Sequence, residues 1–132
     1  QLCKEIGAYG DVADDFMHLD QEHFRAARLV VDTGIHSLGW TEEQAVDYMI
    51  NTGRLSPDQA RSEVRRYITL PGQATGYKIG MLKIMELRRK AETALGPRFD
   101  IKGFDDLIIS NGSQPLPVLE RRVDEWIGTQ KG

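Results

Sequence analysis

The spacing of apolar and polar residues is helical from one end of the chain to the other. Apolar positions recur three or four residues apart, and no stretch alternates in the way that a half-buried strand does. The connections between the periodic stretches are a few residues each, which favours neighbouring antiparallel helices. The pattern predicts an all-α fold of about six helices with short connections, over about residues 14–36, 42–51, 57–69, 73–94, 101–109 and 118–127.

The predicted helix ends carry their own signals. Thr41 and Gln44 form a capping box, in which each side chain bonds the backbone N–H of the other. Ser56 and Gln59 repeat that arrangement, and Pro57 occupies the first helical position, where a missing N–H costs nothing. Residues that end helices follow the predicted segments, at Gly39, Gly53, Pro71-Gly72, Gly96-Pro97 and Asn111-Gly112.

The helix predicted over about residues 73–94 is long and uninterrupted. Its charged residues lie mostly on the outward face, and its apolar residues predict the face that packs in the core. That core face consists of Ile79, Leu82, Ile84 and Met85. Asp100 then caps the short fifth helix.

A polar row lies on the first predicted helix. Arg28, Asp32 and His36 are four residues apart, so they share one helix face. We predict that Asp32 pairs with Arg28 one turn back and orients His36 one turn on. A carboxylate that holds an imidazole fixes which ring nitrogen carries the proton, as at many working histidines. The alternative is a structural ion pair beside a half-buried histidine.

A second segment, Leu70 to Gly80, combines a chain break with candidate polar groups. Gln73 and Tyr77 lie one helical turn apart, and the neighbouring Gly76 and Gly80 leave backbone room for another helix or a ligand. A helix-borne tyrosine can donate its phenolic hydrogen to developing oxyanion charge. The alternative is a half-buried packing residue whose hydroxyl is solvated.

Composition and charge alter this picture only locally. The chain of 132 residues fits one domain, predicted over residues 1–132, and its net charge of −3 gives no electrostatic case for nucleic acid. Eight bases and two acids lie between Arg61 and Lys90, whereas seven acids and three bases lie between Gln1 and Trp40. This basic block faces either an acidic ligand or, as the default, the acidic first segment. Within it, Arg65-Arg66-Tyr67 is predicted to be a solvated face.

Several classes of site find no support in the residues. Cys3 is the only cysteine, so neither an internal disulfide nor a cysteine metal site can form. The three histidines are not spaced as a zinc pair, and no phosphate-binding glycine loop or nucleophile elbow is present. The apolar runs are too short for a membrane span, and no signal peptide is visible. Because the chain starts at Gln1, inside what reads as folded sequence, we interpret it as a fragment of a longer protein.

Three stretches in the same order resemble one bacterial family: RAARLVVDTGIHSLGWT at 25–41, EVRRYITLPGQATGYKIG at 63–80 and NGSQPLPVLERRV at 111–123. The family is known as domain of unknown function 885, and its members are regarded as candidate zinc metallopeptidases. The resemblance runs from Gly7 to Trp126 and concerns the C-terminal part of the family. It implies the C-terminal lobe of a larger, mostly helical metallopeptidase-like fold with a deep cleft.

The resemblance also implies roles for particular residues. The family's metal motif, His-Glu-x-x-Pro-Gly-His-His, and a later Glu-Gly-Trp-Ala segment lie upstream of the matched region, and neither occurs in this chain. Zinc is therefore implied for the full-length protein, with no metal ligand or cofactor in this chain. In related helical zinc peptidases a Tyr and a His bind the scissile carbonyl, and by that analogy Tyr77 and His36 are the catalytic candidates. The candidates for substrate binding are Arg28, Asp32, Gln73 and Lys78.

Two functions of different classes follow. The leading prediction is a lobe that lines the cleft of a zinc-dependent peptidase or hydrolase and is inactive alone, because activating the water requires the metal. Its partners are then the N-terminal part of the same protein and a peptide substrate. The alternative is a non-catalytic helical module that binds a protein through the basic block. The sequence leaves the bacterial compartment open between periplasm, cell envelope and cytoplasm.

Overall fold

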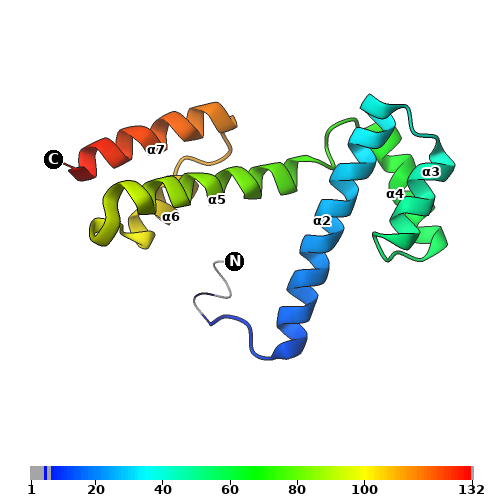
Figure 1. Ribbon diagram of the computed structural model, residues 1–132, viewed down its shortest axis with the longest axis horizontal. Coiled ribbons are helices and arrows are strands. Elements are labelled where there is room, and N and C mark those ends of the chain that lie inside the picture. Colours follow the sequence, from blue (N-terminus) through cyan, green and yellow to red (C-terminus); the bar gives the residue numbers. More distant parts are fainter. Residues whose placement is uncertain (1–4, 6, 132) are drawn as a thin grey trace. The chain divides into compact units, whose positions relative to one another are not determined.

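The computed structural model describes residue 5 and residues 7–131 and is all-α there, with no strand (Figure 1). Its helices are α2 Val12–Leu38, α3 Glu42–Asn51, α4 Pro57–Thr69, α5 Gly76–Leu95, α6 Ile101–Ile109 and α7 Leu116–Lys131. A 3-10 turn, Gly96–Arg98, follows α5. The predicted fold class is therefore confirmed. Cys3 lies outside the described residues.

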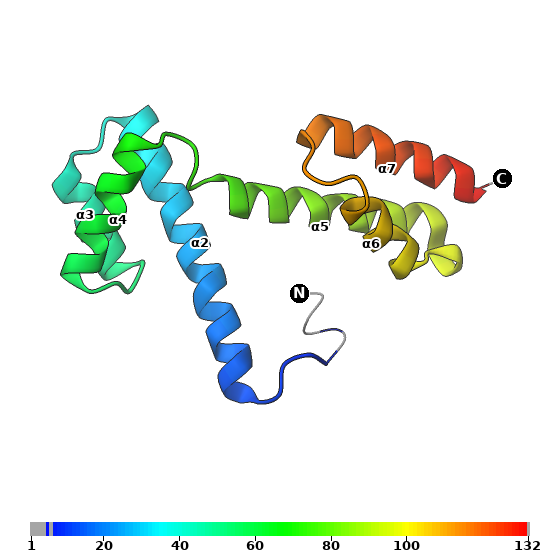
Figure 2. The same cartoon turned by 180° about the vertical axis from the view of Figure 1, so that it is seen from behind.

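The chain forms two compact units, residues 1–78 and residues 79–132, and each has its own buried core. In the first unit α2, α3 and α4 pack against one another, as both ribbon views show (Figures 1 and 2). The second unit holds most of α5 together with α6 and α7. Every site residue predicted from the sequence belongs to the first unit.

The capping signals read from the sequence are present in the structure. Thr41 Oγ1 accepts the Gln44 N–H at 3.2 Å, and Gln44 Oε1 accepts the Thr41 N–H at 2.9 Å. Ser56 and Gln59 form the second capping box, and Asp100 caps α6. These side chains define helix starts because they satisfy N–H groups that have no partner within the helix.

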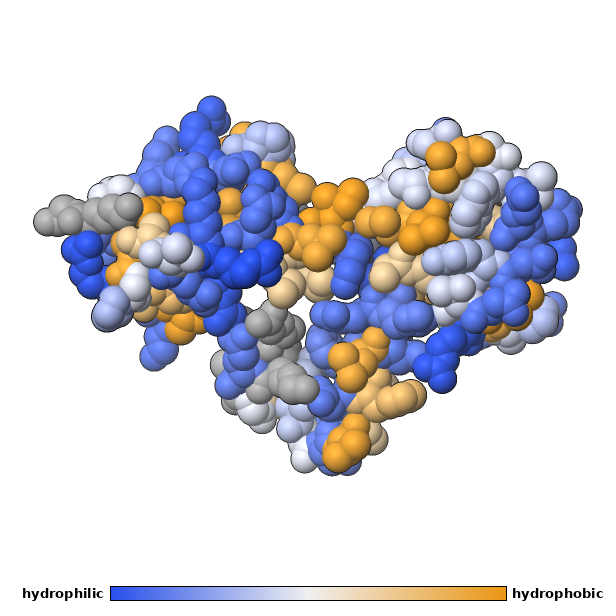
Figure 3. Space-filling view, in the orientation of Figure 1, coloured by the Kyte–Doolittle hydropathy of each residue, from blue (hydrophilic) through white to orange (hydrophobic). Residues whose placement is uncertain are grey.

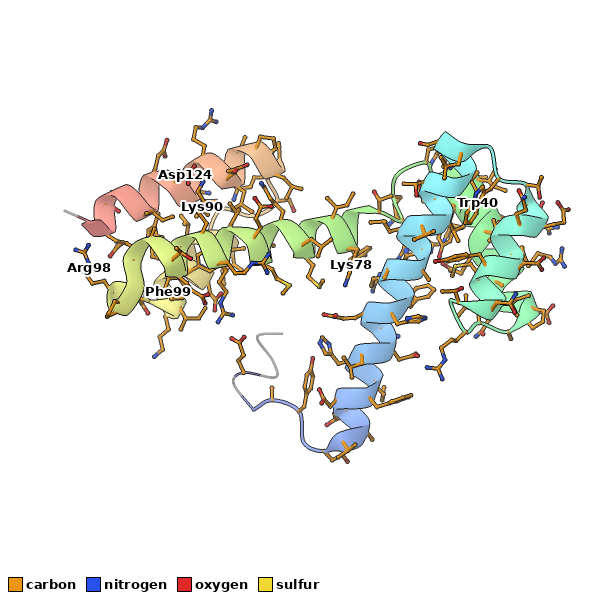
Figure 4. All side chains as sticks on the ribbon, in the orientation of Figure 1. Trp40, Lys78, Lys90, Arg98, Phe99 and Asp124 are labelled. Atoms are coloured by element: carbon orange, nitrogen blue, oxygen red, sulfur yellow. The ribbon has the colours of Figure 1, made fainter. Side chains whose placement is uncertain are left out.

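A tight corner joins α2 to α3. Gly39 ends α2 with a φ of 69°, a left-handed conformation that favours glycine. The Trp40 N–H donates to the Gly34 carbonyl at 3.0 Å, and a Cβ at Gly34 would lie 2.5 Å from the indole ring. Trp40 therefore lies directly against the α2 backbone, with its ring 5.5 Å from that of Tyr48 (Figure 4).

The core of the second unit corrects the predicted face of α5. Ile79 and Leu82 were expected in the core, but they are 43% and 51% exposed. The buried positions of α5 are instead Leu87, Ala91 and Leu95, which pack with α6 and α7. The helix carries two apolar rows. Hydrophobic periodicity alone does not determine which row packs against other helices, and only the tertiary structure shows which one is buried.

The first half of α2 exposes apolar side chains. These are Val12, Phe16, Met17 and Leu19, each more than half exposed. They account for the orange surface at the N-terminal end of α2 in Figure 3. Among the described residues, none of the helices combines the length and apolar content needed to cross a bilayer.

Candidate functional site

Asp32 anchors the connection between α4 and α5 to α2. Its carboxylate is 2% exposed and accepts the Gly72 N–H at 3.0 and 3.1 Å and the Ala74 N–H at 3.3 Å. These backbone groups are held by a side chain of α2, so residues 72–75 form a turn. As a result α5 begins at Gly76, three residues after the predicted start.

Arg28 is a buried cation one turn before Asp32 on α2. Its side chain is 3% exposed, and Nη2 donates to Gln73 Oε1 at 2.9 Å. The guanidinium carbon lies 5.3 to 5.7 Å from the centres of three aromatic rings, which are those of Phe24, Tyr67 and Tyr77. Such rings attract a cation through their electron-rich faces. Arg28 therefore joins α2 to the turn before α5 and to α4.

The hydrogen bonds predicted along the polar row of α2 are wrong. Arg28 bonds Gln73, Asp32 bonds the turn, and His36 Nε2 donates to the Tyr67 carbonyl at 3.0 Å. The four-residue spacing does place the three side chains on one face. Their partners, however, come from segments brought there by folding: the Gln73 side chain, the Gly72 and Ala74 N–H groups and the Tyr67 carbonyl.

Tyr77 lies in the first turn of α5 with its ring 55% exposed. The Arg25 guanidinium stacks on that ring at 4.0 Å from its centre. Lys78, the next residue, has its Nζ 3.8 Å from Glu22 Oε2 of α2; Lys78 is labelled in Figure 4. A Cβ at Gly76 would meet nothing within 4 Å, so the chain beside Tyr77 has the open space predicted for it.

Sequence reasoning missed a second polar network on α4. Tyr67 Oη donates to Glu63 Oε2 at 2.6 Å, and Arg66 forms an ion pair with the same carboxylate. Arg66 Nη1 also donates to Gln73 Oε1 at 3.2 Å. The predicted solvated face is therefore wrong for Tyr67, which is 1% exposed. The network could have been predicted from helix spacing, because Arg66 and Tyr67 follow Glu63 by three and four residues and so lie within reach of its carboxylate.

The surroundings shift two pKa values in this network. Burial raises the pKa of the Tyr67 hydroxyl, and its bond to the Glu63 carboxylate raises it further. Burial also acts to raise the pKa of Glu63. Hydrogen bonds from Arg66 and Tyr67 outweigh it and lower that pKa below its ordinary value of 4.5.

We expect Glu63 to stabilise the fold above its unfolded pKa and to lose this contribution on acidification. The folded pKa is lowered, so the stabilisation is present above 4.5 and disappears as pH falls through the folded value. Melting temperatures of the wild type and Glu63→Gln should therefore differ most near neutral pH and converge between about pH 5 and about pH 3. A difference that stays constant over this range would contradict the assignment.

The structure brings four of the six predicted residues into one cluster. These are Arg28, Asp32, Gln73 and Tyr77, at the contact of α2 with the turn before α5. Lys78 is held by Glu22, and His36 by the end of α4. A hollow of about 450 Å³ is lined by Trp40, Gln44, Asp47, Tyr48, Asn51 and Thr52, and none of the six predicted residues lines it.

The histidines are committed to separate contacts. His18 Nε2 lies 3.7 Å from Glu22, His23 Nε2 donates to the Thr52 carbonyl, and His36 Nε2 donates to Tyr67. Within residues 5 and 7–131, no three His, Cys, Asp or Glu side chains are grouped so that they could hold a metal ion. The described part of this chain therefore does not fit a resident zinc.

The basic block is largely paired with acids, but mostly not with those expected. The pairs are Arg65–Glu42, Arg66–Glu63, Lys78–Glu22, Lys83–Glu86, Lys83–Glu120, Arg88–Glu92 and Lys90–Asp124. Among these, only Lys78 uses an acid from the first 40 residues. The default prediction is therefore wrong for Arg65, Arg66, Lys83 and Lys90, which pair with acids of their own unit; the Lys90–Asp124 pair is labelled in Figure 4.

Comparisons with known proteins agree with this architecture. A family model described as "Bacterial protein of unknown function (DUF885)" matches residues 1–123. The fold is similar to the crystal structure of "the putative lipoprotein from Colwellia psychrerythraea", with 44% sequence identity and a TM-score of 0.92. That match covers 98% of this chain and 22% of the other, so this chain spans 22% of the length of that relative. No curated protein matches.

Proposed function

This chain belongs to the DUF885 family of bacterial proteins of unknown function, and we propose that it forms the C-terminal helical lobe of a zinc-dependent peptidase. In this proposal it lines the substrate cleft, whereas the metal is held by residues outside this chain. The main support is the turn before α5, which buried Asp32 and Arg28 fix to α2. Because α5 begins directly after this turn, Tyr77 lies in its first helical turn, where the residue is more than half exposed.

Tyr77 is the group of this lobe that we assign to the reacting carbonyl. Its phenol is exposed, and its ring is oriented by Arg25 and Arg28, which lie 4.0 and 5.3 Å from the ring centre. A phenolic O–H held in this way can donate to an oxygen that gains negative charge. The two guanidinium groups also favour negative charge nearby.

His36 supports a different contact. Because its Nε2 donates to the Tyr67 carbonyl, neutral His36 carries its proton there and leaves Nδ1 as an acceptor. The side chain is exposed. We therefore assign neutral His36 to accept an N–H of the bound peptide rather than to donate to its carbonyl.

Burial separates the four substrate-binding candidates into two kinds. Arg28 and Asp32 are 3% and 2% exposed, so in the free protein their proposed role is to position the turn and Tyr77. Gln73 is exposed, and Lys78 retains part of its surface. These two residues are the ones we assign to direct contact with the peptide backbone.

We further propose a place in the bacterial envelope for the full-length protein. The support is the relative from Colwellia psychrerythraea, which is described as a lipoprotein and matches nearly the whole of this chain. The alternative function, a protein-binding module that uses the basic block, gains less support. Most bases of that block already have a carboxylate partner, so little uncompensated positive charge remains to recruit an acidic surface.

The test uses the full-length protein. We expect it to bind zinc, and we expect it to hydrolyse peptides from a mixed peptide library, with hydrolysis lost on chelation and restored by zinc. Zinc content and the cleavage products, measured by mass spectrometry, are independent readouts. A folded, zinc-loaded protein that cleaves no peptide would contradict the proposal and favour the binding module.

A further inference from the structure

One neutral oxygen lies between two cations at the turn before α5. Gln73 Oε1 accepts from Arg28 Nη2 at 2.9 Å and from Arg66 Nη1 at 3.2 Å. An amide oxygen carries no net charge. A carboxylate in the same position would offer charged acceptors, and guanidinium groups bind carboxylates with short, strong, often paired hydrogen bonds.

The positive charge at this place is not fully compensated. Arg28 is 3% exposed, yet its hydrogen-bonded partner is neutral, and its buried Nε has no partner among the described residues. Buried charges are normally paired with an opposite charge. Arg25 stacks on the Tyr77 ring, and the structure records no carboxylate bound to it in the part that it describes.

Two carboxylates of the cluster, those of Asp32 and Glu63, are already engaged. Asp32 accepts backbone N–H groups of the turn, and Glu63 accepts from Arg66 and Tyr67. Glu63 therefore balances Arg66 directly, whereas no carboxylate among the described residues is recorded as bonded to Arg25 or Arg28. This arrangement favours the approach of one further anion.

We propose that Arg25, Arg28 and Arg66, grouped around Gln73 and Tyr77, bind a carboxylate of the peptide substrate. The assignment rests on the proposed function, because it takes the ligand to be a peptide. The carboxylate replaces Gln73 Oε1 between Arg28 and Arg66. Gln73 can turn from the two arginines toward the peptide backbone because its side chain is exposed, and Tyr77 is exposed beside it, so the core need not open.

Two chemical sources supply such a carboxylate: the C-terminus of the peptide and an Asp or Glu side chain. The test measures binding to the full-length protein by calorimetry, after removal of metal with a chelator, so that a metal-bound carboxylate makes no contribution. The probes are N-acetyl-dialanine with a free carboxylate, the same peptide as its amide, and N-acetyl-aspartyl-alanine amide. Tighter binding of the first probe identifies the C-terminus, and tighter binding of the third identifies an acidic side chain.

We expect the preferred carboxylate probe to bind at least about 10-fold more tightly than the uncharged amide, because ionic hydrogen bonds to guanidinium are strong. Arg66→Gln should remove most of that preference. The matched control is Arg65→Gln. Arg65 lies on the same helix and pairs with Glu42 at 2.9 Å, so this variant should leave the carboxylate preference unchanged. Melting temperatures verify that both variants are folded.

Equal binding of acid and amide probes, or an unchanged preference in folded Arg66→Gln, would overturn the carboxylate site. Neither result involves hydrolysis, so the two proposals can fail separately. If the protein cleaves peptides but shows no carboxylate preference, only the carboxylate site is contradicted. If it prefers carboxylates but cleaves no peptide, the proposed function is contradicted and the carboxylate site is supported.

Discussion

Replacing Tyr77 by Phe in the full-length protein should lower peptide turnover about 10²- to 10³-fold while the fold is retained. The change removes one hydroxyl and leaves the ring, so its stacking with Arg25 and Arg28 at 4.0 and 5.3 Å is preserved. Removal of a single oxyanion donor elsewhere typically costs about 3–4 kcal/mol of barrier. The effect should appear in kcat, because the hydroxyl acts on charge that develops only in the transition state.

The matched control for this variant is Tyr48→Phe. Tyr48 also carries a phenol, lies on α3 against Trp40 and belongs to another part of the first unit. Its substitution should leave turnover within about 2-fold and the melting temperature nearly unchanged. Unchanged turnover in a correctly folded Tyr77→Phe protein would remove Tyr77 from the site and leave His36 as the catalytic candidate.

Replacing Asp32 by Asn should destabilise the chain by about 2 kcal/mol, because the new NH₂ group cannot accept a hydrogen bond. The carboxylate uses both oxygens on the Gly72 N–H and one on the Ala74 N–H, and it is 2% exposed. In the Asn variant, the side-chain NH₂ group, a donor, faces the Gly72 or Ala74 N–H group, which is also a donor. Urea unfolding followed by far-UV circular dichroism measures the loss.

Asp20→Asn is the control for Asp32→Asn, since Asp20 is an exposed carboxylate on the same helix. It should change the unfolding free energy by less than about 0.5 kcal/mol. In the full-length protein Asp32→Asn should also reduce turnover, because the turn that starts α5 at Gly76 is no longer held in place. Stability equal to that of the Asp20 variant would show that the Asp32 bonds do not hold the turn.

The boundaries of most helices followed from short stretches of sequence. The capping boxes at Thr41 and Ser56 and the cap at Asp100 placed three helix starts correctly. The helices α2 and α7 start two residues earlier than predicted, at Val12 and Leu116, and α5 starts three residues later, at Gly76 instead of about Gln73. A cap acts through residues two or three positions away, so it can be read locally, whereas the turn before α5 is held by a carboxylate 40 residues earlier.

Local information also identified the residues of the candidate site better than it identified their contacts. The four-residue spacing placed Arg28, Asp32 and His36 on one face of α2, and the folded chain keeps them there. Glu63 and Arg66 were missed, although their spacing on α4 was visible. Charged residues on an exposed helix face usually remain solvated, so nothing in the local pattern distinguished this pair from the others.

Helix periodicity thus accounts for the all-α fold and for which side chains share a face, because both depend on neighbours within one or two turns. The partners of those side chains depend on the tertiary structure. Arg28 binds a residue 45 positions away, Asp32 one 40 positions away and His36 one 31 positions away. Buried N–H and C=O groups must find a partner, and only the packing of α4 and the following turn against α2 decides which side chain supplies it.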